Sequence, residues 1–521
     1  MPYTEHRPDQ LDAIRLILQS PARVIGVCGP PGFGKSELPV AVHATTGLET
    51  RILVGTRALE QQYMDSYAAP SLINLVDVRG RDNYRCIIKL VPATAAQGVC
   101  RDGVWCRYRA EGCPYYDAVK IASEAGIAVT NYPFQVNRRS SLGDVVYLFC
   151  DEADTLFDIL SDYLRVVLRS GEVRRLLHCD LPGAECNQEE LRSWAVAARE
   201  TITVPPSDNP VKRQTKSEPN GLRELREQLS RLMAMRGEWV LEHVSGRDGA
   251  LQTVTATPVW PVDYLEDLVY RSAPKIVLMS ATLTENDVRM LTPASSSYDY
   301  RSYPSRIPVH RRRIMHVRCT PMRGRTGSRT DWQRWTVTAD RLLLARRDRR
   351  SIFSTTSYER QHQYLKRSEL TDICPAFTVI APVRGEPLDE AIDRFRHTDP
   401  PTVLVSPAIV RGYSFQGDDC RLLIVGKMPF PPPSPLLSAR RKRNPGYQSY
   451  AAMQTLQQEI MRPVRDPSDW AELVIIDDDW AWLQKSRSLM LPWFEEAIGY
   501  SVDYLPPLPL DWSGEGGSPM R

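Results

Sequence analysis

The stretch of sequence that decides the fold is residues 24–36, VIGVCGPPGFGKS. It opens with a short apolar run at 24–27, which is typical of a buried strand. A glycine-rich turn follows at once, and residues 29–36 fit the pattern G-x-x-x-x-G-K-[ST]. A helical stretch comes next, so the chain has the order strand, loop and helix that a phosphate-binding P-loop requires.

This pattern gives each of its fixed residues a role. Backbone N–H groups of a turn that contains Gly29, Gly32 and Gly34 can converge on phosphate oxygens. Lys35 would reach the β- and γ-phosphates, and the Ser36 hydroxyl would hold Mg²⁺. The alternative is a chance glycine-rich turn, which the order of the flanking elements disfavours. We therefore predict that this loop binds ATP.

A P-loop needs a second, acidic site, and residues 145–152 provide one. The apolar run VVYLFC leads straight into Asp151 and Glu152, so a buried strand would carry Asp151 to its C-terminal edge. There Asp151 would hold Mg²⁺, and Glu152 would orient and deprotonate the attacking water. The alternative is a helix N-cap. Near the N-terminus, Gln10 is a candidate reader of an adenine edge, and the alternative is a surface glutamine.

Short apolar runs recur along the whole chain, with helical stretches between them. Uniform rather than alternating hydrophobicity predicts strands that are covered by helices on both faces. Two parallel α/β units fit this pattern better than one oversized sheet. The first set of runs is 24–27, 52–54, 127–129, 145–150 and 276–279; the second is 352–353, 377–380, 403–405, 422–425 and 473–476.

The charge of the chain is balanced overall but gathered locally. Lys and Arg number 66 against 63 for Asp and Glu, which leaves a net charge of +3. Residues 306–350 nevertheless hold fourteen arginines against three aspartates, and residues 440–443 read RRKR. No apolar stretch reaches the roughly 18 residues of a membrane span, and the N-terminus lacks a secretion signal. We expect a cytoplasmic protein, prokaryotic or phage-encoded rather than nuclear.

Four of the eleven cysteines lie close together in the sequence, at Cys86, Cys100, Cys106 and Cys113. In a chain without an export signal, such clustering points to a metal site before disulfides. Thiolates in this number suit either an iron–sulfur cluster or Zn²⁺. The spacings contain no C-x-x-C knuckle, which weakens the zinc interpretation.

Several short motifs resemble those of superfamily 2 helicases of the XPD/DinG type, in the order of that family. They are TRALEQQ at 56–62 (motif Ia), TNY at 130–132, DEAD at 151–154 (motif II), SATL at 280–283 (motif III), RGYSF at 411–415 (motif V), KMPF at 427–430 and QEIMRPVR at 458–465 (motif VI). The resemblance covers most of residues 3–500. Met461 departs from the glycine of motif VI, and Arg411 and Ser414 depart from the acids of motif V.

The resemblance implies an α/β fold with two RecA-like parallel-sheet motor domains, an inserted Fe–S cluster domain and a helical Arch-like insertion. The implied parts are motor domain 1 at 1–80, the four-cysteine Fe–S domain at 81–118, motor domain 1 again at 119–156, the Arch-like insertion at 157–250, the end of motor domain 1 at 251–295, motor domain 2 at 296–505 and a flexible tail at 506–521.

The resemblance also implies ligands and catalytic residues. It assigns the four cysteines to a [4Fe–4S] cluster, in which they would build a rigid wedge rather than a redox catalyst. From motif VI it implies that Gln458, Arg462 and Arg465 act in catalysis. Guanidinium groups from a second domain commonly contact a γ-phosphate, and the alternative for this pair of arginines is a solvated helix face.

The expected partner is single-stranded and forked DNA. Cations neutralise the backbone and aromatic rings stack on bases, so we predict contacts from Arg311, Arg312 and Arg313, with Trp332 and Trp335 as stacking faces. The residues of the matched motifs add Thr56 and Asn131 to the predicted contacts. The alternative is a solvated basic loop.

From the sequence we therefore expect an ATP-dependent DNA helicase. We expect it to be a monomer and not to associate with a membrane, and the resemblance implies 5′→3′ movement. Two alternatives stay open. One is an ATPase that single-stranded DNA stimulates and that translocates with little unwinding. The other is a non-enzymatic nucleic-acid-binding protein with a degenerate nucleotide site, against which the intact Lys35, Ser36, Asp151 and Glu152 speak.

Overall fold

The computed structural model of the chain describes residues 7–68, 73–88, 93–98, 100, 105–138, 142–183, 185–202, 220–246, 251–270, 273–322, 328–407 and 413–503. Arg411 of the motif V segment and the expected tail at 506–521 lie outside these ranges. Within them, no helix is long and apolar enough to cross a membrane.

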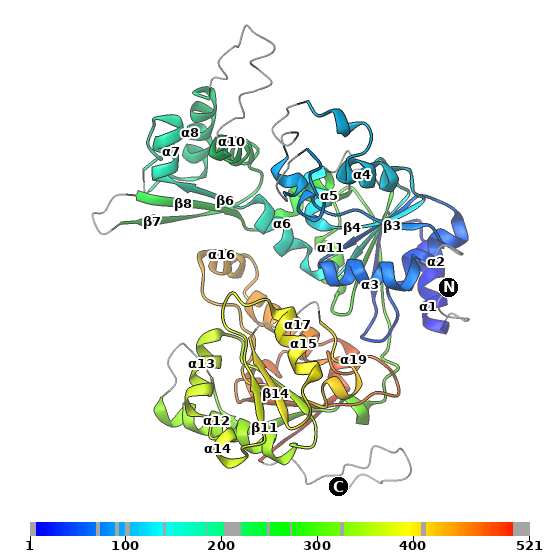
Figure 1. Cartoon of the computed structure of the whole chain (residues 1–521), viewed down its shortest axis with the longest axis vertical. Coiled ribbons are helices and arrows are strands. Elements are labelled where there is room, and N and C mark those ends of the chain that lie inside the picture. The colour runs from blue at the N-terminus through cyan, green and yellow to red at the C-terminus, as the bar shows by residue number, and fades with distance from the viewer. Residues whose placement is uncertain are drawn as a thin grey trace. The chain divides into compact units, whose positions relative to one another are not determined.

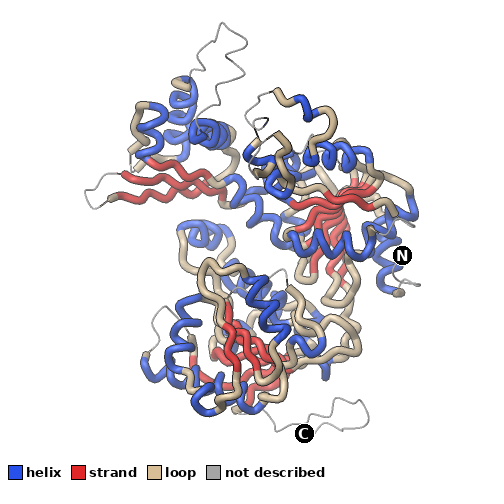
Figure 2. Tube along the Cα trace, viewed as in Figure 1, coloured by secondary structure: helices blue, strands red, loops and turns tan. Residues whose placement is uncertain are grey.

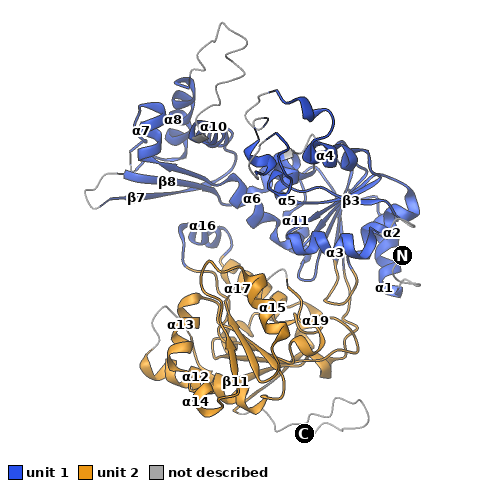
Figure 3. Cartoon of the chain, viewed as in Figure 1, with its two compact units in different colours: residues 1–27, 35–301, 433–444 blue, residues 28–34, 302–432, 445–521 orange. Residues whose placement is uncertain are grey.

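The chain divides into two compact units (Figure 3). Unit 1 holds residues 1–27, 35–301 and 433–444, and unit 2 holds residues 28–34, 302–432 and 445–521. Each unit contains one large sheet, as the two sets of apolar runs predict.

Unit 1 is built on a seven-stranded sheet with the order β10-β1-β9-β5-β2-β4-β3. Strands β3 and β4 of this sheet are labelled in Figure 1. The neighbours β9–β5, β5–β2, β2–β4 and β4–β3 run parallel. Every position of β1, β2 and β5 is buried, as strands covered on both faces require. The strands are β1 (Val24–Cys28), β2 (Thr50–Val54), β3 (Leu75–Asp77), β4 (Ile127–Asn131), β5 (Tyr147–Asp151), β9 (Lys275–Ser280) and β10 (Tyr298–Ser302).

Helices accompany this sheet in the alternating order that parallel strands need. Helix α3 packs through Tyr63 and Tyr67 into a core shared with β2 and β4, against residues such as Val54 and Val129. The helices are α1 (Pro8–Gln19), α2 (Glu37–Thr46), α3 (Arg57–Tyr67), α4 (Pro114–Glu124), α5 (Tyr132–Arg138), α6 (Leu156–Leu164) and α11 (Glu285–Met290).

The insertion after motif II contains the predicted helices together with a small sheet that the apolar pattern did not predict. This sheet has three strands, β6 (Val166–Arg169), β8 (Leu251–Pro258) and β7 (Trp239–Ser245), which pair antiparallel in that order. Strands are drawn in red in Figure 2. Helices α7 (Ser170–Leu177), α8 (Gln188–Glu200) and α10 (Asn220–Met233) cover one face of this sheet. Leu225, Leu229 and Leu232 of α10 are buried there, on the apolar stripe that the sequence shows.

Helix α16 (Pro435–Arg443) comes from the last third of the chain but belongs to unit 1, where it lies against β7. Its Arg440 is buried. The guanidinium of Arg440 donates to the Val259 carbonyl at 3.0 Å, pairs with Asp158 at 3.2 Å and lies over the Trp260 ring at 5.0 Å. Part of the predicted basic patch at 440–443 is therefore a packing contact.

Unit 2 is built on a fully parallel seven-stranded sheet with the order β13-β14-β12-β15-β16-β11-β17. The strands are β11 (Ile314–Thr320), β12 (Arg350–Ser354), β13 (Thr378–Ile380), β14 (Thr402–Ser406), β15 (Leu422–Val425), β16 (Glu472–Asp477) and β17 (Ile498–Val502). The helices are α12 (Arg329–Ala345), α13 (Tyr358–Arg367), α14 (Leu370–Ile373), α15 (Leu388–His397), α17 (Tyr447–Ile460), α18 (Trp480–Leu483) and α19 (Pro492–Glu495).

Two tryptophans of the arginine-rich segment lie in the core of unit 2 and not on its surface. Trp332 is 6% exposed and Trp335 is 0% exposed. They lie on one face of α12, and the Trp335 indole N–H donates to the Gly426 carbonyl at 2.7 Å. This corrects the expectation that they offer stacking faces to bases, because a ring inside the core has no face for a base.

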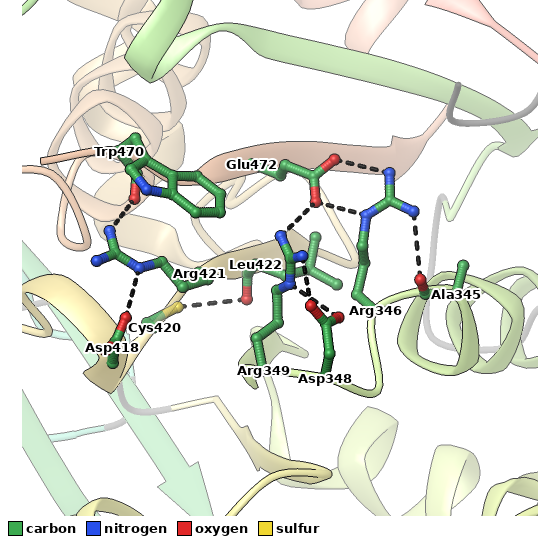
Figure 4. Close-up of polar contacts among 10 residues, drawn as sticks. All are labelled: Ala345, Arg346, Asp348, Arg349, Asp418, Cys420, Arg421, Leu422, Trp470 and Glu472. Atoms are coloured by element: carbon green, nitrogen blue, oxygen red, sulfur yellow. Dashed lines mark hydrogen bonds and ion pairs between the residues drawn. The ribbon is translucent and has the colours of Figure 1, made fainter. Parts of the chain in front are cut away.

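Several arginines of the same segment are also committed to internal contacts (Figure 4). Arg346 donates to both oxygens of the buried Glu472 carboxylate, at 2.6 and 2.8 Å. Arg349 lies 3.5 Å from the same carboxylate, and Arg349 and Arg421 both lie over the Trp470 ring. A high local count of arginine is therefore partly a structural requirement of this sheet.

Candidate nucleotide site

The predicted P-loop has the local geometry of a turn that only glycine can make. Gly32 has a φ of +77° and Gly34 a φ of +85°, which side chains strongly disfavour. A Cβ at Gly32 would also lie 2.2 Å from the main-chain oxygen of Arg465, which belongs with residues 28–34 to unit 2. Helix α2 begins at Glu37, directly after Lys35 and Ser36, so the loop ends at a helix N-terminus as expected.

The predicted metal-holding carboxylate lies at the C-terminal edge of β5 in unit 1. Asp151 is 4% exposed. Its carboxylate accepts hydrogen bonds from the Glu152 N–H at 2.9 Å and from the Tyr63 hydroxyl at 3.2 Å. Burial raises the pKa of Asp151, and the positive charge of Lys35 acts in the opposite direction. The structure thus brings Lys35 and Asp151 close enough to interact.

Glu152 adopts a backbone conformation that is costly for a residue with a side chain. Its φ is +50°, in the left-handed region, and such strain in a non-glycine residue is concentrated at functional sites. The short turn η5 (Ala153–Thr155) follows, but the Glu152 side chain makes no capping hydrogen bond to it. The side chain instead points toward Gly55, where a Cβ would lie 2.7 Å from its Oε2 atom. The N-cap interpretation is therefore disfavoured.

Tyr63 is a residue of this site that sequence reasoning missed. Its ring is 1% exposed and its hydroxyl donates to the Asp151 carboxylate. The Ser36 hydroxyl also lies near the same phenol. No motif marks position 63; the available signal is that it lies one turn after Leu59 on the inner face of α3, where a buried hydroxyl needs a polar partner.

Gln10 is buried rather than exposed, which removes the surface-glutamine alternative. Its amide oxygen accepts from the Arg7 N–H at 2.9 Å, and its amide nitrogen donates to the Glu37 carboxylate at 3.0 Å. The side chain thus connects the start of α1 to the start of α2. The reading of an adenine edge by Gln10 stays a prediction.

The residues of the site fit a Mg²⁺ ion. This cation prefers oxygen ligands, keeps several waters and takes only one or two protein ligands beside the phosphates of a nucleotide. The Ser36 hydroxyl and the Asp151 carboxylate are such ligands. The Tyr63 phenol donates to the Asp151 carboxylate and lies near Ser36. In the described part of the chain, no three or more His, Cys, Asp or Glu side chains come together as a metal-binding group.

The four cysteines are ligands of the type that an iron–sulfur cluster requires, but the described residues do not bring all four thiols together. Cys86, Cys106 and Cys113 are buried, and Cys100 is half-buried. A Cβ at Gly98 would lie 3.3 Å from the Cys86 sulfur and 3.5 Å from the Cys100 sulfur, so these two thiols face the same glycine. The described residues bring no third thiol to them. The [4Fe–4S] cluster and its Zn²⁺ alternative therefore stay predictions.

The motif VI residues lie in unit 2, at and after the end of α17. Gln458 and Arg465 are half-buried. Arg462 is 5% exposed and its guanidinium donates to the Tyr413 carbonyl. Met461, in place of the family's glycine, is fully buried and caps the C-terminus of α17. None of these residues is part of a solvated helix face.

The predicted nucleic-acid contacts separate into two groups. Thr56 accepts from the Leu59 N–H at 3.3 Å and caps α3, and Asn131 accepts from the Phe134 N–H at 2.9 Å. Both side chains thus have local structural partners.

Of the three arginines, Arg313 is exposed. Arg311 is half-buried and donates to the Pro467 carbonyl at 2.9 Å. Arg312 is 0% exposed; it donates to the Ile307 carbonyl at 2.8 Å and pairs with Glu496. This corrects the expectation for Arg312, because a buried guanidinium cannot reach a phosphate.

None of the curated protein sequences matches the chain significantly. A family model described as a helicase C-terminal domain matches residues 341–497, which lie in unit 2 except for residues 433–444 of unit 1. The match begins in α12 and ends just before β17, so it spans most of the unit 2 sheet.

Solved structures of XPD helicases share the fold over nearly the whole chain. A structure titled "XPD_Helicase" has a TM-score of 0.60 and 14% identity, and the match covers 94% of this chain and 98% of that one. A structure titled "XPD_APO" has a TM-score of 0.58 and 13% identity, with 95% and 100% covered. The Xpd4 protein of S. tokodaii has a TM-score of 0.57 and 13% identity, with the same coverage. The chain thus has the fold of these XPD helicase structures, and residues 341–497 are similar to a helicase C-terminal domain.

Proposed function

We propose that the chain is an ATP-dependent DNA helicase that moves 5′→3′ on single-stranded DNA. The observation that carries this proposal is the arrangement at the end of β5. There a buried Asp151 lies near Lys35, and a strained Glu152 follows it without capping a helix. A buried carboxylate next to a P-loop lysine is the pair that nucleotide hydrolysis requires.

Each residue of this site has a distinct task in hydrolysis. Lys35 would offset the charge of the β- and γ-phosphates. Glu152 would orient the attacking water and take its proton. A Mg²⁺ ion held by Ser36 and Asp151 would supply charge that stabilises the transferring phosphoryl group. We further propose that Arg462 and Arg465 of motif VI contact the γ-phosphate, as guanidinium groups do in related reactions.

The proposed partner is single-stranded and forked DNA, with Arg311 and Arg313 among its phosphate contacts. Arg313 is exposed, so its charge is accessible to a polyanion. Thr56 directly precedes α3, and Asn131 is the last residue of β4, directly before α5. Strands β2 and β4, after which these helices come, are neighbours in the sheet. Helix N-termini at one sheet edge favour anionic ligands. This supports the proposal that the phosphate backbone of a single DNA strand crosses this edge.

We also propose that the segment with the four cysteines holds a [4Fe–4S] cluster and acts as a wedge. The two thiols that face Gly98 support this proposal in part. Iron content and the visible spectrum of anaerobically purified protein test it. A colourless preparation with stoichiometric zinc and no iron would replace the cluster by zinc.

Unwinding of forked duplexes that carry either a 5′ or a 3′ single-stranded tail tests the function directly, with ATP hydrolysis measured in parallel. The proposal predicts unwinding from the 5′ tail alone, and loss of both unwinding and hydrolysis in Lys35→Ala. Unwinding from the 3′ tail alone would contradict the polarity. A chain that hydrolyses no ATP with or without DNA would be a non-enzymatic binding protein.

One alternative has an observation in its favour. Met461 fills with a buried side chain the position where the family has glycine, and Arg462 donates to the Tyr413 carbonyl. Both features commit motif VI residues to contacts within unit 2. An ATPase that translocates on a single strand with little unwinding would show strong DNA-stimulated hydrolysis and no product from either forked duplex.

A further inference from the structure

We propose that Tyr63 is a positioning residue that sets the Asp151 carboxylate and the Ser36 hydroxyl for one Mg²⁺ ion. The proposal rests on the nucleotide site proposed above and names a residue outside its motifs. Tyr63 lies on α3, whereas Ser36 precedes α2 and Asp151 ends β5. The phenol therefore connects three separate elements of unit 1 at the place where the metal would bind.

The geometry of the phenol allows it to serve both ligands at once. A tyrosine hydroxyl has one proton to donate and lone pairs that accept. The proton goes to the Asp151 carboxylate, at 3.2 Å, and the Ser36 hydroxyl lies near the phenol oxygen. The second carboxylate oxygen accepts from the Glu152 N–H. Asp151 is thus held by one donor on each oxygen, which fixes the plane of the carboxylate.

The surroundings of Tyr63 keep this arrangement rigid. Its ring is 1% exposed and packs in the core with Tyr67, Val54 and Val129. A buried ring with a fixed χ1 angle holds its hydroxyl in one place, so the carboxylate is oriented before the metal arrives. A hydroxyl that only satisfied its own burial would need one partner; this one meets both residues proposed to hold the metal.

The test is Tyr63→Phe, which keeps the ring and removes the hydroxyl. ADP binding to the full chain is measured by calorimetry without Mg²⁺ and at saturating Mg²⁺. The expected result is unchanged affinity without the metal and an about tenfold smaller gain in affinity on adding it, because a hydrogen bond to a charged group is lost. ATP hydrolysis should then need about tenfold more free Mg²⁺ for half its maximal rate.

The matched control is Tyr270→Phe. The Tyr270 hydroxyl is equally buried and donates to the Leu291 carbonyl at 3.1 Å, so its loss reports the general cost of removing a buried phenol hydroxyl. The Mg²⁺-dependent gain should be that of the wild type in this control. The same gain in Tyr63→Phe as in wild type would overturn the positioning role while the nucleotide site stands. If the wild type binds ADP no better than Lys35→Ala does, the nucleotide site itself fails, and this inference with it.

Discussion

Two buried strands of the molecule end in an aspartate, and the surroundings of the two carboxylates differ. In unit 1, β5 ends at Asp151, and in unit 2, β16 ends at Asp477. Both side chains are buried, at 4% and 0% exposed, and burial raises the pKa of both. In the sequence the two segments, YLFCDE and LVIIDD, follow the same rule of an apolar run before an acid pair.

The two carboxylates differ in the groups that donate hydrogen bonds to them. Asp477 accepts hydrogen bonds from the main-chain N–H groups of Met322 at 3.0 Å, Met428 at 2.7 Å and Asp479 at 3.0 Å. These donors belong to three separate segments, so the Asp477 carboxylate holds those three segments together at the end of β16. A carboxylate used in this way is structural.

Asp151 has one backbone donor, from Glu152, and one side-chain donor, from Tyr63, and Lys35 supplies its nearest opposing charge. Its acceptor capacity is therefore less completely used by the protein than that of Asp477. The sequence pattern is the same for both acids. The number of hydrogen-bond donors that the protein supplies to each carboxylate is what distinguishes a candidate metal ligand from a structural residue.

The largest expected effect concerns the acids that follow these aspartates. Glu152→Gln should lower kcat for ATP hydrolysis by about 10²- to 10⁴-fold, because the general base is lost, and leave ADP affinity unchanged. Asp478→Asn is the matched control: Asp478 pairs with His316 at 3.1 Å and accepts from the Cys319 N–H at 2.8 Å. Steady-state kinetics of both variants decide the matter. Equal losses in the two would remove the distinction between the two strand ends.

The opposite end of β16 offers a second test of the structural interpretation of unit 2. Glu472→Leu should lower the free energy of unfolding by about 3–5 kcal/mol, because it leaves the buried Arg346 guanidinium without its partner. Replacing both residues, with Arg346→Met added, should recover much of that loss. Urea unfolding of the single and double variants measures this. A double variant as unstable as the single one would show that the ion pair is not the cause.

A smaller effect depends on pH and involves Glu60 of α3, the helix of unit 1 that also carries Tyr63. Burial raises the pKa of Glu60 from 4.5 to about 7, although Arg79 lies 3.4 Å away. The folded chain therefore binds this proton more tightly than the unfolded chain, so stability should fall as pH rises from 4.5 to about 7. Glu60→Gln should match the wild type near the acid end and exceed it by roughly 1–3 kcal/mol at pH 8. Melting temperatures across this range would contradict the account if the variant gained nothing at high pH.

The sequence predicts the parts of the fold that repeat a simple rule. All ten apolar runs fall in strands of the two large sheets, because a strand buried on both faces must be apolar throughout. Four strands of these sheets, β3, β10, β11 and β17, match none of the runs, and two of them show how a strand departs from this rule. β10 reads YDYRS at a sheet edge, and β11 reads IMHVRCT with a buried His316 and an exposed Arg318.

The candidate site was predictable as far as fixed spacing reaches. Lys35, Ser36 and Asp151 follow from two local motifs. Lys35 and Asp151 lie close enough to interact, and the roles of all three stay predictions. Tyr63 could not be found in this way, because its contact with Asp151 spans 88 positions and depends on how α3 packs. Arg312 and Trp335 were misplaced for a related reason: composition shows that a residue is charged or aromatic but not whether the core needs it.

The most direct test of the comparison is to change both strand-terminal aspartates in the same way and to measure two quantities on each variant. ATP hydrolysis and thermal unfolding would be recorded for Asp151→Asn and Asp477→Asn. The account predicts that Asp151→Asn melts at or above the wild-type temperature and hydrolyses ATP at least about a hundredfold more slowly, since a buried charge and a metal ligand are lost together. Asp477→Asn should lose about 1–3 kcal/mol of stability, because an amide group cannot accept all three N–H donors, and hydrolyse ATP normally per folded molecule. A stable, inactive Asp477→Asn beside an unstable, active Asp151→Asn would contradict it.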